Sequence, residues 1–215
     1  MSILQPSVRP KVVSDDVQSH PGRKMTEREF LAWIALKTRA EWIDGEVEMM
    51  AADSLDHSTY GWWLLALVKE FVERHRLGSA YGPNVLVRLP RRKRIRMPDV
   101  VFIASDSSAV EHPTRIEGSP DLIMEVVSPD SIVRDWHDKY VDFERAGVRE
   151  YWVVDRIRHR VEAFALGRDG KYRAIAEADG RIESTVLKGF YLRIEWLLAP
   201  RPPELLKILR ELGVK

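Results

Sequence analysis

The chain has 215 residues, 45% of them hydrophobic, and seven tryptophans, which is typical of a well-buried globular domain and excludes a disordered protein. It has no cysteine, which excludes disulfide bonds, thiolate metal sites and cysteine nucleophiles. The formal net charge is +1, from 34 basic and 33 acidic residues. The overall charge therefore does not indicate a polyanion-binding protein, and only a local cluster of basic residues could indicate such a binding site.

The sequence predicts one soluble domain with a tail. Residues 1–24 contain Pro, Ser, Gly and scattered charges without periodicity, and we expect them to form a flexible tail. Residues 25–215 are expected to form a single domain. No run approaches the ~18 to 20 uncharged apolar residues of a membrane helix, and we see no signal peptide. A cytoplasmic location is compatible with the lack of cysteine.

A short helix and a hairpin are predicted at the start of this domain. Thr26 and Glu29 form a capping box, which favours a helix ending near Leu36. Strands at 41–43 and 46–49 flank an Asp-Gly pair, which is a strong two-residue turn signal.

A long helix and a pair of strands follow. Ser54 is expected to cap a helix that runs to about Arg76 or Leu77, with Gly78 as the stop. Residues 84–89 predict a strand, and after a basic turn its partner begins at 95 and leads into Asp99.

Two later segments, 98–103 and 120–127, read as central strands covered on both faces. Each is a run of β-branched and large apolar residues opened by a proline. They carry Asp99, Asp121 and Glu125, and a buried carboxylate is costly unless something pairs with it. Asp121 and Glu125 are four residues apart on one strand, about 13 Å, so they cannot share one metal ion. We interpret Asp121 as a structural residue at the start of the strand.

The helix predicted after 128–131, ending near Gly147, contains an unusual lysine. Its apolar stripe consists of Ile132, Trp136, Tyr140 and Phe143. Lys139 projects into the middle of this stripe, where an unpaired ammonium is disfavoured. Because a helix that follows a strand packs back over the sheet, Lys139 is expected to meet Asp99 and Glu125 or else to extend out to solvent.

Strands are predicted at 151–154, 160–166, 172–175 and 186–194, and a last helix at 204–212. The first three of these strands are expected to be antiparallel. The mixture predicts an α/β domain with a mixed central β-sheet flanked by helices. No Gly-rich phosphate loop is present, which argues against a nucleotide-binding fold.

Several segments resemble the Uma-two family of restriction-endonuclease-like proteins, within the PD-(D/E)XK nuclease superfamily. They are 41–46, 97–102, 120–129 and 146–155, within a resemblance that covers about residues 26–197. The resemblance implies a restriction-endonuclease-like fold and metal-dependent nuclease activity. The position two after the strand glutamate, where the superfamily usually has lysine, is Val127. The resemblance implies that the lysine has moved to the helix as Lys139, in agreement with the helical-face argument.

The candidate catalytic residues are Asp99, Glu125, Lys139 and Glu41. Asp99 and Glu125 would bind Mg²⁺, or Mn²⁺, because such ions prefer oxygen ligands; the alternative is that both make structural hydrogen bonds. Lys139 would orient or activate the attacking water and stabilise charge in the transition state, unless it only extends to solvent. The resemblance implies a further metal contact for Glu41, whose alternative is a solvated hairpin residue.

A basic run directly precedes Asp99 and is a candidate nucleic-acid-binding site. It contains Arg91, Arg92, Lys93, Arg94 and Arg96. Such residues bind phosphates with salt-dependent affinity, although most charge runs are solvated turns.

We therefore expect a Mg²⁺-dependent endonuclease, with DNA preferred as the substrate. The alternatives are a non-catalytic nucleic-acid-binding or scaffold protein and an enzyme that acts on another phosphate ester. A homodimer is compatible with the sequence. His57 and His137 lack the spacing of a zinc site and are interpreted as structural or surface residues.

Overall fold

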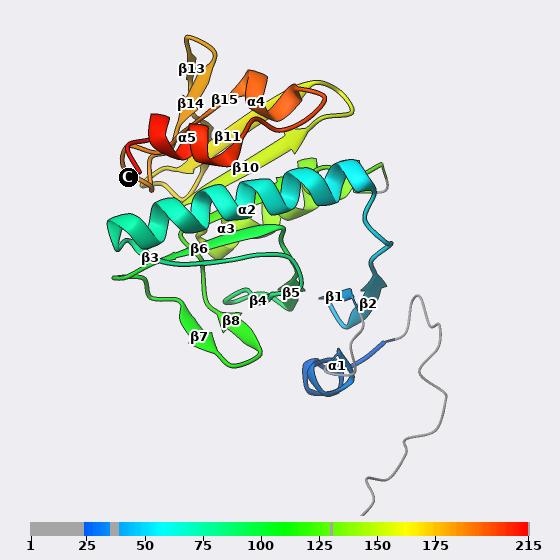
Figure 1. Cartoon of the computed structure of the whole chain (residues 1–215). Helices are drawn as coiled ribbons and strands as arrows, with labels where there is room; N and C mark the ends of the chain where they lie inside the picture. The colour runs from blue at the N-terminus through cyan, green and yellow to red at the C-terminus, as the bar shows by residue number, and fades with distance from the viewer. Residues whose placement is uncertain (1–23, 35–38, 130, 215) are drawn as a thin grey trace, which may run out of the picture.

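The structure is a computed structural model that describes residues 24–34, 39–129 and 131–214 (Figure 1). The expected tail lies outside the described residues, except for Lys24, which forms a bridge with Glu46. The predicted capping box is confirmed, because the Thr26 N–H donates to Glu29 Oε2 over 2.8 Å. The predicted end of this helix near Leu36 lies outside the described residues.

Helices occur early, in the middle and at the end of the described chain. Their bounds are α1 Glu27–Ile34, α2 Leu55–His75, the π-helical turn η1 Arg134–Asp138, α3 Lys139–Ala146, α4 Ile194–Leu198 and α5 Leu205–Glu211. None of the helices in these described ranges has the length and apolarity needed to cross a membrane.

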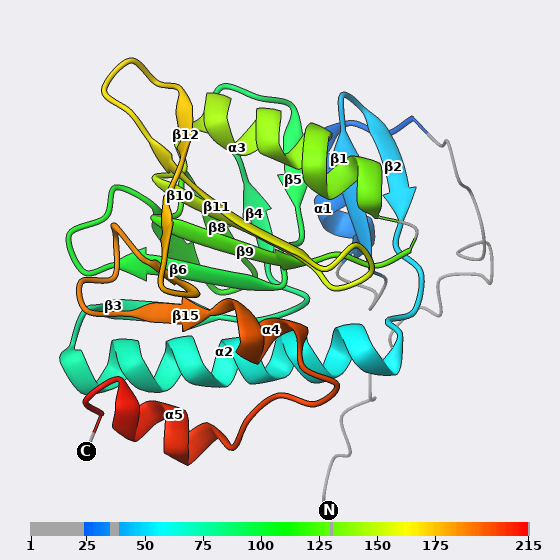
Figure 2. The same ribbon diagram turned by 90° about the horizontal axis from the view of Figure 1, so that it is seen from above.

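A six-stranded central sheet has the order β12-β11-β10-β9-β6-β3. Its strands are β3 Gly78–Tyr81, β6 Val100–Ala104, β9 Leu122–Val126, β10 Glu150–Asp155, β11 Arg160–Leu166 and β12 Tyr172–Ala174. The β9–β10 pair is parallel and the other pairs are antiparallel, so the sheet is mixed. Figure 2 shows α2 on one face of this sheet and α3 on the other. The predicted mixed sheet flanked by helices is confirmed.

The two central strands alternate their side chains between the helices. β6 and β9 are antiparallel, with Val100 opposite Met124 and Phe102 opposite Leu122, and these four side chains pack in the core beneath α2. The intervening residues, Val101, Ile103 and Ile123, pack in a second core with Phe143 of α3. Since side chains alternate along a strand, odd-numbered residues of β6 and β9 face α3.

A second six-stranded sheet has the order β2-β1-β5-β4-β8-β7. Its strands are β1 Ala40–Ile43, β2 Glu46–Met49, β4 Leu86–Arg88, β5 Arg94–Arg96, β7 Val110–His112 and β8 Arg115–Glu117. The predicted hairpins β1–β2 and β4–β5 are both present. The strand beginning near 95 does not continue into the central sheet, because β5 ends at Arg96 and β6 begins at Val100 in the other sheet.

The end of α2 differs from the prediction. The left-handed residue at its C-terminus is Arg76, with φ of 55°, and not Gly78. Gly78 instead begins β3, where an added Cβ would lie 2.0 Å from the backbone oxygen of Ile103. The glycine therefore permits close pairing with β6 and does not serve to stop the helix.

The C-terminal part forms a small three-stranded sheet, β13-β14-β15. Its strands are β13 Glu177–Ala178, β14 Arg181–Glu183 and β15 Tyr191–Arg193. The strand predicted at 186–194 is therefore too long, because only residues 191–193 pair as a strand and α4 begins at Ile194. The predicted last helix agrees with α5 within one residue at each end.

Candidate active site

The register of β6 and β9 brings two acidic side chains together. Val100 pairs with Met124, so continuing the antiparallel register by one residue places Asp99 opposite Glu125. Both are odd-numbered and belong to the α3 side of the sheet. Asp99 is 4% exposed and Glu125 is 2% exposed. The N–H of Val126 donates to Asp99 Oδ2 over 2.8 Å, which anchors one oxygen of that carboxylate.

Lys139 lies against these strands and is 2% exposed. Its Nζ is 2.7 Å from Glu125 Oε1, 3.1 Å from Asp135 Oδ1 and 3.8 Å from Glu41 Oε1. The prediction that this lysine meets carboxylates is confirmed for Glu125, and the alternative of extension into solvent is wrong. No ion pair joins Lys139 to Asp99 among the residues that the structure describes.

The helix presents Lys139 on a polar face that the sequence analysis did not identify. Four of its buried side chains are polar and are spaced by four, four and three residues: Ser131, Asp135, Lys139 and Asp142. This spacing places them on one side of a helix, next to the apolar stripe. The π-helical turn η1 lies within this segment and was not predicted. The carboxylates at i−4 and i+3 from Lys139 were the sequence signal for this face.

The pKa shifts of Lys139 and Glu125 reflect the charges that surround them. Burial by itself would lower the pKa of Lys139, but Asp135, Glu125 and Glu41 raise it above its ordinary value, so the ammonium stays charged. Burial raises the pKa of Glu125, and the nearby charges of Asp99 and Asp135 raise it further. Lys139 lowers the pKa of Glu125 but does not offset burial and the two neighbouring carboxylates together.

His57 is a site residue that sequence reasoning missed. It lies in the first turn of α2, is 8% exposed, and its Nε2 is 3.2 Å from Asp99 Oδ2. Its Nδ1 is 3.4 Å from Asp53 Oδ1, although the geometry is not that of a hydrogen bond. Burial opposes the charged form of His57, but Asp99 and Asp53 raise its pKa above the ordinary value. Burial by itself would raise the pKa of Asp99, but contact with His57 lowers it below the ordinary value.

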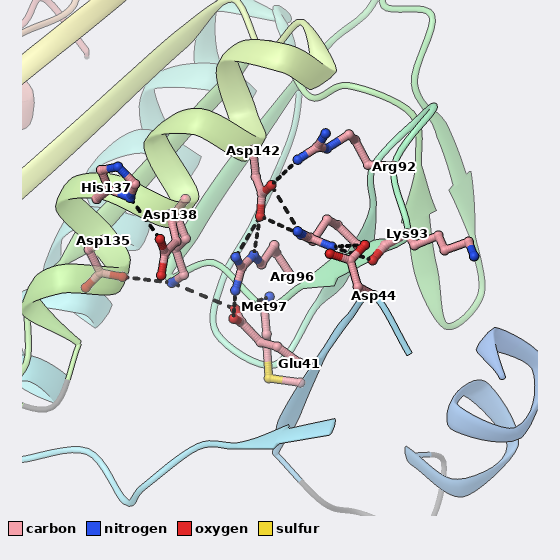
Figure 3. A network of polar contacts seen from close by, with 12 residues as sticks. Glu41, Asp44, Arg92, Lys93, Arg96, Met97, Asp135, His137, Asp138 and Asp142 are labelled. Carbon is pink, nitrogen blue, oxygen red and sulfur yellow. Dashed lines mark hydrogen bonds and ion pairs between the residues drawn. The ribbon is translucent and has the colours of Figure 1, made fainter. Parts of the chain in front are cut away.

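Glu41 lies inside the protein, beside Lys139, and is 1% exposed. Its Oε2 accepts from Arg96 Nη1 over 2.6 Å and its Oε1 accepts from the N–H of Met97 over 2.9 Å (Figure 3). Burial opposes ionisation, but Lys139 and Arg96 lower the pKa of Glu41 to about 2. The alternative of a solvated hairpin residue is therefore wrong. Both oxygens of Glu41 accept hydrogen bonds, and its carboxylate also lies within ion-pair distance of Lys139.

The basic run divides into an inner and an outer part. Arg92, Arg94 and Arg96 all contact the buried carboxylate of Asp142, at 3.2, 3.1 and 2.6 Å (Figure 3). Arg96 is only 1% exposed, which corrects the expectation that it contacts nucleic acid. It is an interior residue because Asp142 and Glu41 neutralise its charge.

The outer part of the run is Arg91 and Lys93. Both residues are exposed, in the turn between β4 and β5. Arg92 and Arg94 are intermediate, with side chains 25% and 13% exposed. A nucleic acid could therefore reach the tip of this hairpin.

A cavity of about 20 Å³ opens beside the paired acids. Its lining is Met50, Ala51, Ala52, Asp53, His57, Asp99, Glu125, Val126, Ser128, Ser131, Arg134, Asp135 and Lys139. This volume holds about one water molecule or one small ion. Glu41 does not line the cavity, so the structure gives no support to a metal contact from this residue.

The donors at this cavity fit a small hard cation. The contacts of Asp99 fall on Oδ2 and the ion pair of Glu125 with Lys139 falls on Oε1, so in the described part of the chain the second oxygen of each carboxylate has no protein partner. The described residues contain no group of three or more His, Asp or Glu that could hold an ion. Two carboxylates supplemented by water are nevertheless a common set of ligands for Mg²⁺.

The other acid and histidine of the sequence analysis lie in structural or surface positions. Asp121 Oδ2 accepts from the N–H of Ala104 over 2.8 Å, and its Oδ1 accepts from Arg149 over 3.0 Å. His137 is exposed, with its Nδ1 2.9 Å from Asp138 Oδ1.

Comparison with known proteins identifies the family and supports the fold. Residues 28–195 match the Uma2 family, described as "Putative restriction endonuclease". A solved structure, a putative nuclease belonging to DUF820 from Anabaena variabilis ATCC 29413, is similar with a TM-score of 0.63 and 16% identity. The similarity covers 79% of this chain and 97% of that one, and it supports the restriction-endonuclease-like fold. No curated protein matches the chain. The match over most of its length shows that the chain belongs to the Uma2 family of putative restriction endonucleases.

Proposed function

We propose that the protein is a divalent-metal-dependent endonuclease that hydrolyses phosphodiester bonds, with DNA as the preferred substrate. The observation that carries this proposal is the meeting of Asp99 and Glu125 across β6 and β9, beside a cavity that Lys139 also lines. A charged lysine and two carboxylates around a small cavity suit a reaction in which water attacks a phosphate.

Each residue has a distinct part in this proposal. Asp99 and Glu125 would hold Mg²⁺ or Mn²⁺, and such an ion, when bound, lowers the pKa of water and neutralises charge on the phosphate. Lys139 keeps its proton because its pKa is raised, so it acts as a hydrogen-bond donor to water or to a phosphate oxygen and not as a general base. Glu41 Oε1 lies 3.8 Å from this ammonium, and Glu41 does not line the cavity, so it is a positioning residue.

His57 also has a positioning part. Its Nε2 and the N–H of Val126 both approach Asp99 Oδ2, which fixes the orientation of this cavity-lining carboxylate. Outer groups of this kind orient metal ligands in many sites.

The exposed tip of the β4–β5 hairpin is the proposed contact with the nucleic-acid backbone. Arg91 and Lys93 would neutralise phosphates there, and Arg92 and Arg94 would add to the positive potential near them. Arg96 takes no direct part, because its guanidinium is buried.

A cleavage assay tests the function. The purified protein is incubated with supercoiled plasmid, single-stranded DNA or RNA, in Mg²⁺, in Mn²⁺ and in excess chelator. We expect cleavage of DNA with either ion and none in chelator. Asp99→Asn, which removes charge with little change of shape, should abolish cleavage and weaken binding of the ion in a calorimetric titration.

Two results would contradict the proposal. Cleavage that persists unchanged in the Asp99→Asn protein would place the activity elsewhere or in a contaminant. Absence of cleavage on every substrate, together with retained binding of DNA, would favour a non-catalytic nucleic-acid-binding protein.

A further inference from the structure

The cavity contains a second cation, Arg134, to which the proposed mechanism gives no part. Arg134 is the first residue of η1 and lines the cavity together with Asp99, Glu125 and Lys139. It is of intermediate exposure, and its Nε is buried without a hydrogen-bond partner in the described part of the chain. A buried donor without a partner is costly, so this guanidinium is suited to an acceptor from outside the protein.

The charges of the other cations at the site are already balanced within the protein. Lys139 lies within 4.0 Å of the carboxylates of Glu125, Asp135 and Glu41. Arg39, near the same cavity, pairs with Asp53 over 3.0 Å. For Arg134, in contrast, no carboxylate lies within ion-pair distance among the residues that the structure describes.

The cavity would repel a phosphodiester without such a free charge. Four carboxylates line it, from Asp53, Asp99, Glu125 and Asp135. A phosphodiester at the opening of this cavity brings one more negative charge close to them. A metal ion offsets two of these charges, and an unpaired guanidinium would provide additional attraction where a phosphate oxygen has to come to rest.

The π-helical turn holds Arg134 beside the reacting groups. Asp135, the next residue, is fixed twice: its carboxylate accepts from the Ser131 hydroxyl, and its backbone oxygen accepts from the Tyr151 hydroxyl over 2.8 Å. Both Arg134 and Asp135 line the cavity although they are neighbours in sequence. Single π-helical turns occur frequently at functional sites.

We propose that Arg134 binds the substrate phosphate, donating hydrogen bonds to non-bridging oxygens of the phosphodiester that is cleaved. The planar fork of a guanidinium matches two phosphate oxygens, which a lysine cannot reproduce. This assignment rests on the proposed function, because it takes the substrate of the cavity to be a phosphodiester.

The test compares Arg134→Gln and Arg134→Lys with Arg168→Gln, which removes the same charge from an exposed loop. Cleavage of a labelled oligonucleotide is followed in Mg²⁺. We expect Arg134→Gln to lower kcat/KM by about 100-fold, as does loss of one donor to a developing oxyanion. Arg134→Lys should recover only part of this loss, and Arg168→Gln should leave kcat/KM near that of the parent protein.

Two further measurements separate a phosphate contact from a structural part. Thermal unfolding and calorimetric titration with Mg²⁺ should be nearly the same for Arg134→Gln and the parent protein, because Arg134 touches neither carboxylate that would hold the ion. Fluorescence anisotropy with the same oligonucleotide should show weaker binding by Arg134→Gln and a slope of log K against log[salt] reduced by about one.

The outcomes distinguish this inference from the proposed function. If the parent protein cleaves and Arg134→Gln cleaves equally well, the assignment of Arg134 is wrong while the proposed function stands. If the parent protein cleaves no phosphodiester, the proposed function is wrong. The assignment of Arg134 is then tested by anisotropy alone, and equal affinity and equal salt slope in Arg134→Gln and the parent protein overturn it.

Discussion

Two charge clusters on the same helical segment have opposite compositions. In the first, a single ammonium, that of Lys139, lies among the carboxylates of Glu125, Asp135 and Glu41. In the second, a single carboxylate, that of Asp142, lies among the guanidinium groups of Arg92, Arg94 and Arg96. Both central groups are almost fully buried, and Arg96 joins the clusters because it binds both Asp142 and Glu41 (Figure 3).

The two clusters also differ in how they relate to the cavity beside Asp99. Both oxygens of Asp142 accept hydrogen bonds from arginines, which tie β5 to α3. In the Lys139 cluster, Glu125 Oε1 and Asp135 Oδ1 lie 2.7 and 3.1 Å from the ammonium, and both residues line the cavity beside Asp99. We infer that the Asp142 cluster, whose carboxylate is shared by three arginines, stabilises the fold, whereas the Lys139 cluster, in which three carboxylates surround one ammonium, is suited to a cation.

The largest effect is expected from Lys139→Met. Methionine keeps the apolar contacts of the side chain but leaves the buried acids without their cation. Removing one partner of a buried ion pair costs about 3 kcal/mol or more, so thermal unfolding in chelator should show a clear loss of stability. Cleavage should fall by at least about 100-fold, because the donor beside the attacked phosphate is lost.

Added Mg²⁺ separates the two effects of Lys139→Met. Binding of the ion to the native state should restore part of the stability by mass action. Activity should not return, because the ion cannot replace the ammonium group. A variant that is as stable as the parent protein in chelator, and equally active, would show that Lys139 belongs to neither the electrostatic balance nor the chemistry.

Asp142→Asn should affect stability and spare the reaction. Asparagine keeps the shape but leaves three arginines without a shared counter-charge, so we expect a loss of about 3 kcal/mol in the free energy of unfolding. Asp138→Asn, an exposed acid in the same segment, is the matched control and should change stability by less than about 0.5 kcal/mol. Denaturant titrations and a cleavage assay normalised to folded protein measure both quantities. A specific loss of activity in folded Asp142→Asn would contradict the division between the clusters.

The lowered pKa of Glu41 predicts that stability decreases as the pH becomes acidic. Its pKa is lowered from 4.5 to about 2 in the folded protein, so its contribution is fully present well above pH 4.5 and is lost as pH falls toward 2. Between pH 5 and pH 3 the free energy of unfolding should fall by about 2 kcal/mol on account of this group. Glu41→Gln should be less stable at neutral pH and should lose this part of the pH dependence. Parallel pH profiles in the two proteins would be inconsistent with the buried ion pair.

The smallest effect is expected at the hairpin tip. Arg91→Gln with Lys93→Gln removes two exposed charges and leaves the Asp142 cluster intact, so stability should be unchanged. DNA affinity should fall a few-fold at low salt, and the difference should shrink as salt rises. A paired change at Arg168 and Lys188, which are also exposed, is the control. Equal salt slopes in the hairpin variant and the parent protein would place the tip away from the nucleic acid.

The parts of the fold that could be predicted from sequence are those with strong local signals. The apolar runs of β6 and β9, the Asp-Gly turn and the caps at Ser54 and Gly147 act over a few residues, and all five are present. Strands β3 and β8 are only four and three residues long, and β3 pairs with β6 and β8 with β4, which are distant in the chain. Division of the strands between two sheets likewise depends on these long-range pairings.

The same reasoning applies to the site. The position of Lys139 among apolar residues predicted either carboxylates around it or extension to solvent, because a buried ammonium needs a counter-charge. Asp135 lies four residues before Lys139, and this helical spacing would have predicted their ion pair. His57 could not be found in this way, since it reaches Asp99 from α2 across the end of the sheet and has no local motif. The η1 turn, which places Arg134 at the cavity, has no sequence signature of its own.

The most direct test of the central claim is the rate of Mg²⁺-dependent plasmid cleavage by Glu125→Gln and Asp121→Asn, measured side by side with the parent protein. Both substitutions remove one buried carboxylate charge at β9, but only Glu125 lines the cavity. The account predicts that Glu125→Gln lowers the rate by at least about 100-fold, whereas folded Asp121→Asn cleaves at nearly the parent rate. Equal rates for the two variants, whether both high or both low in folded protein, would contradict an active site at Asp99, Glu125 and Lys139.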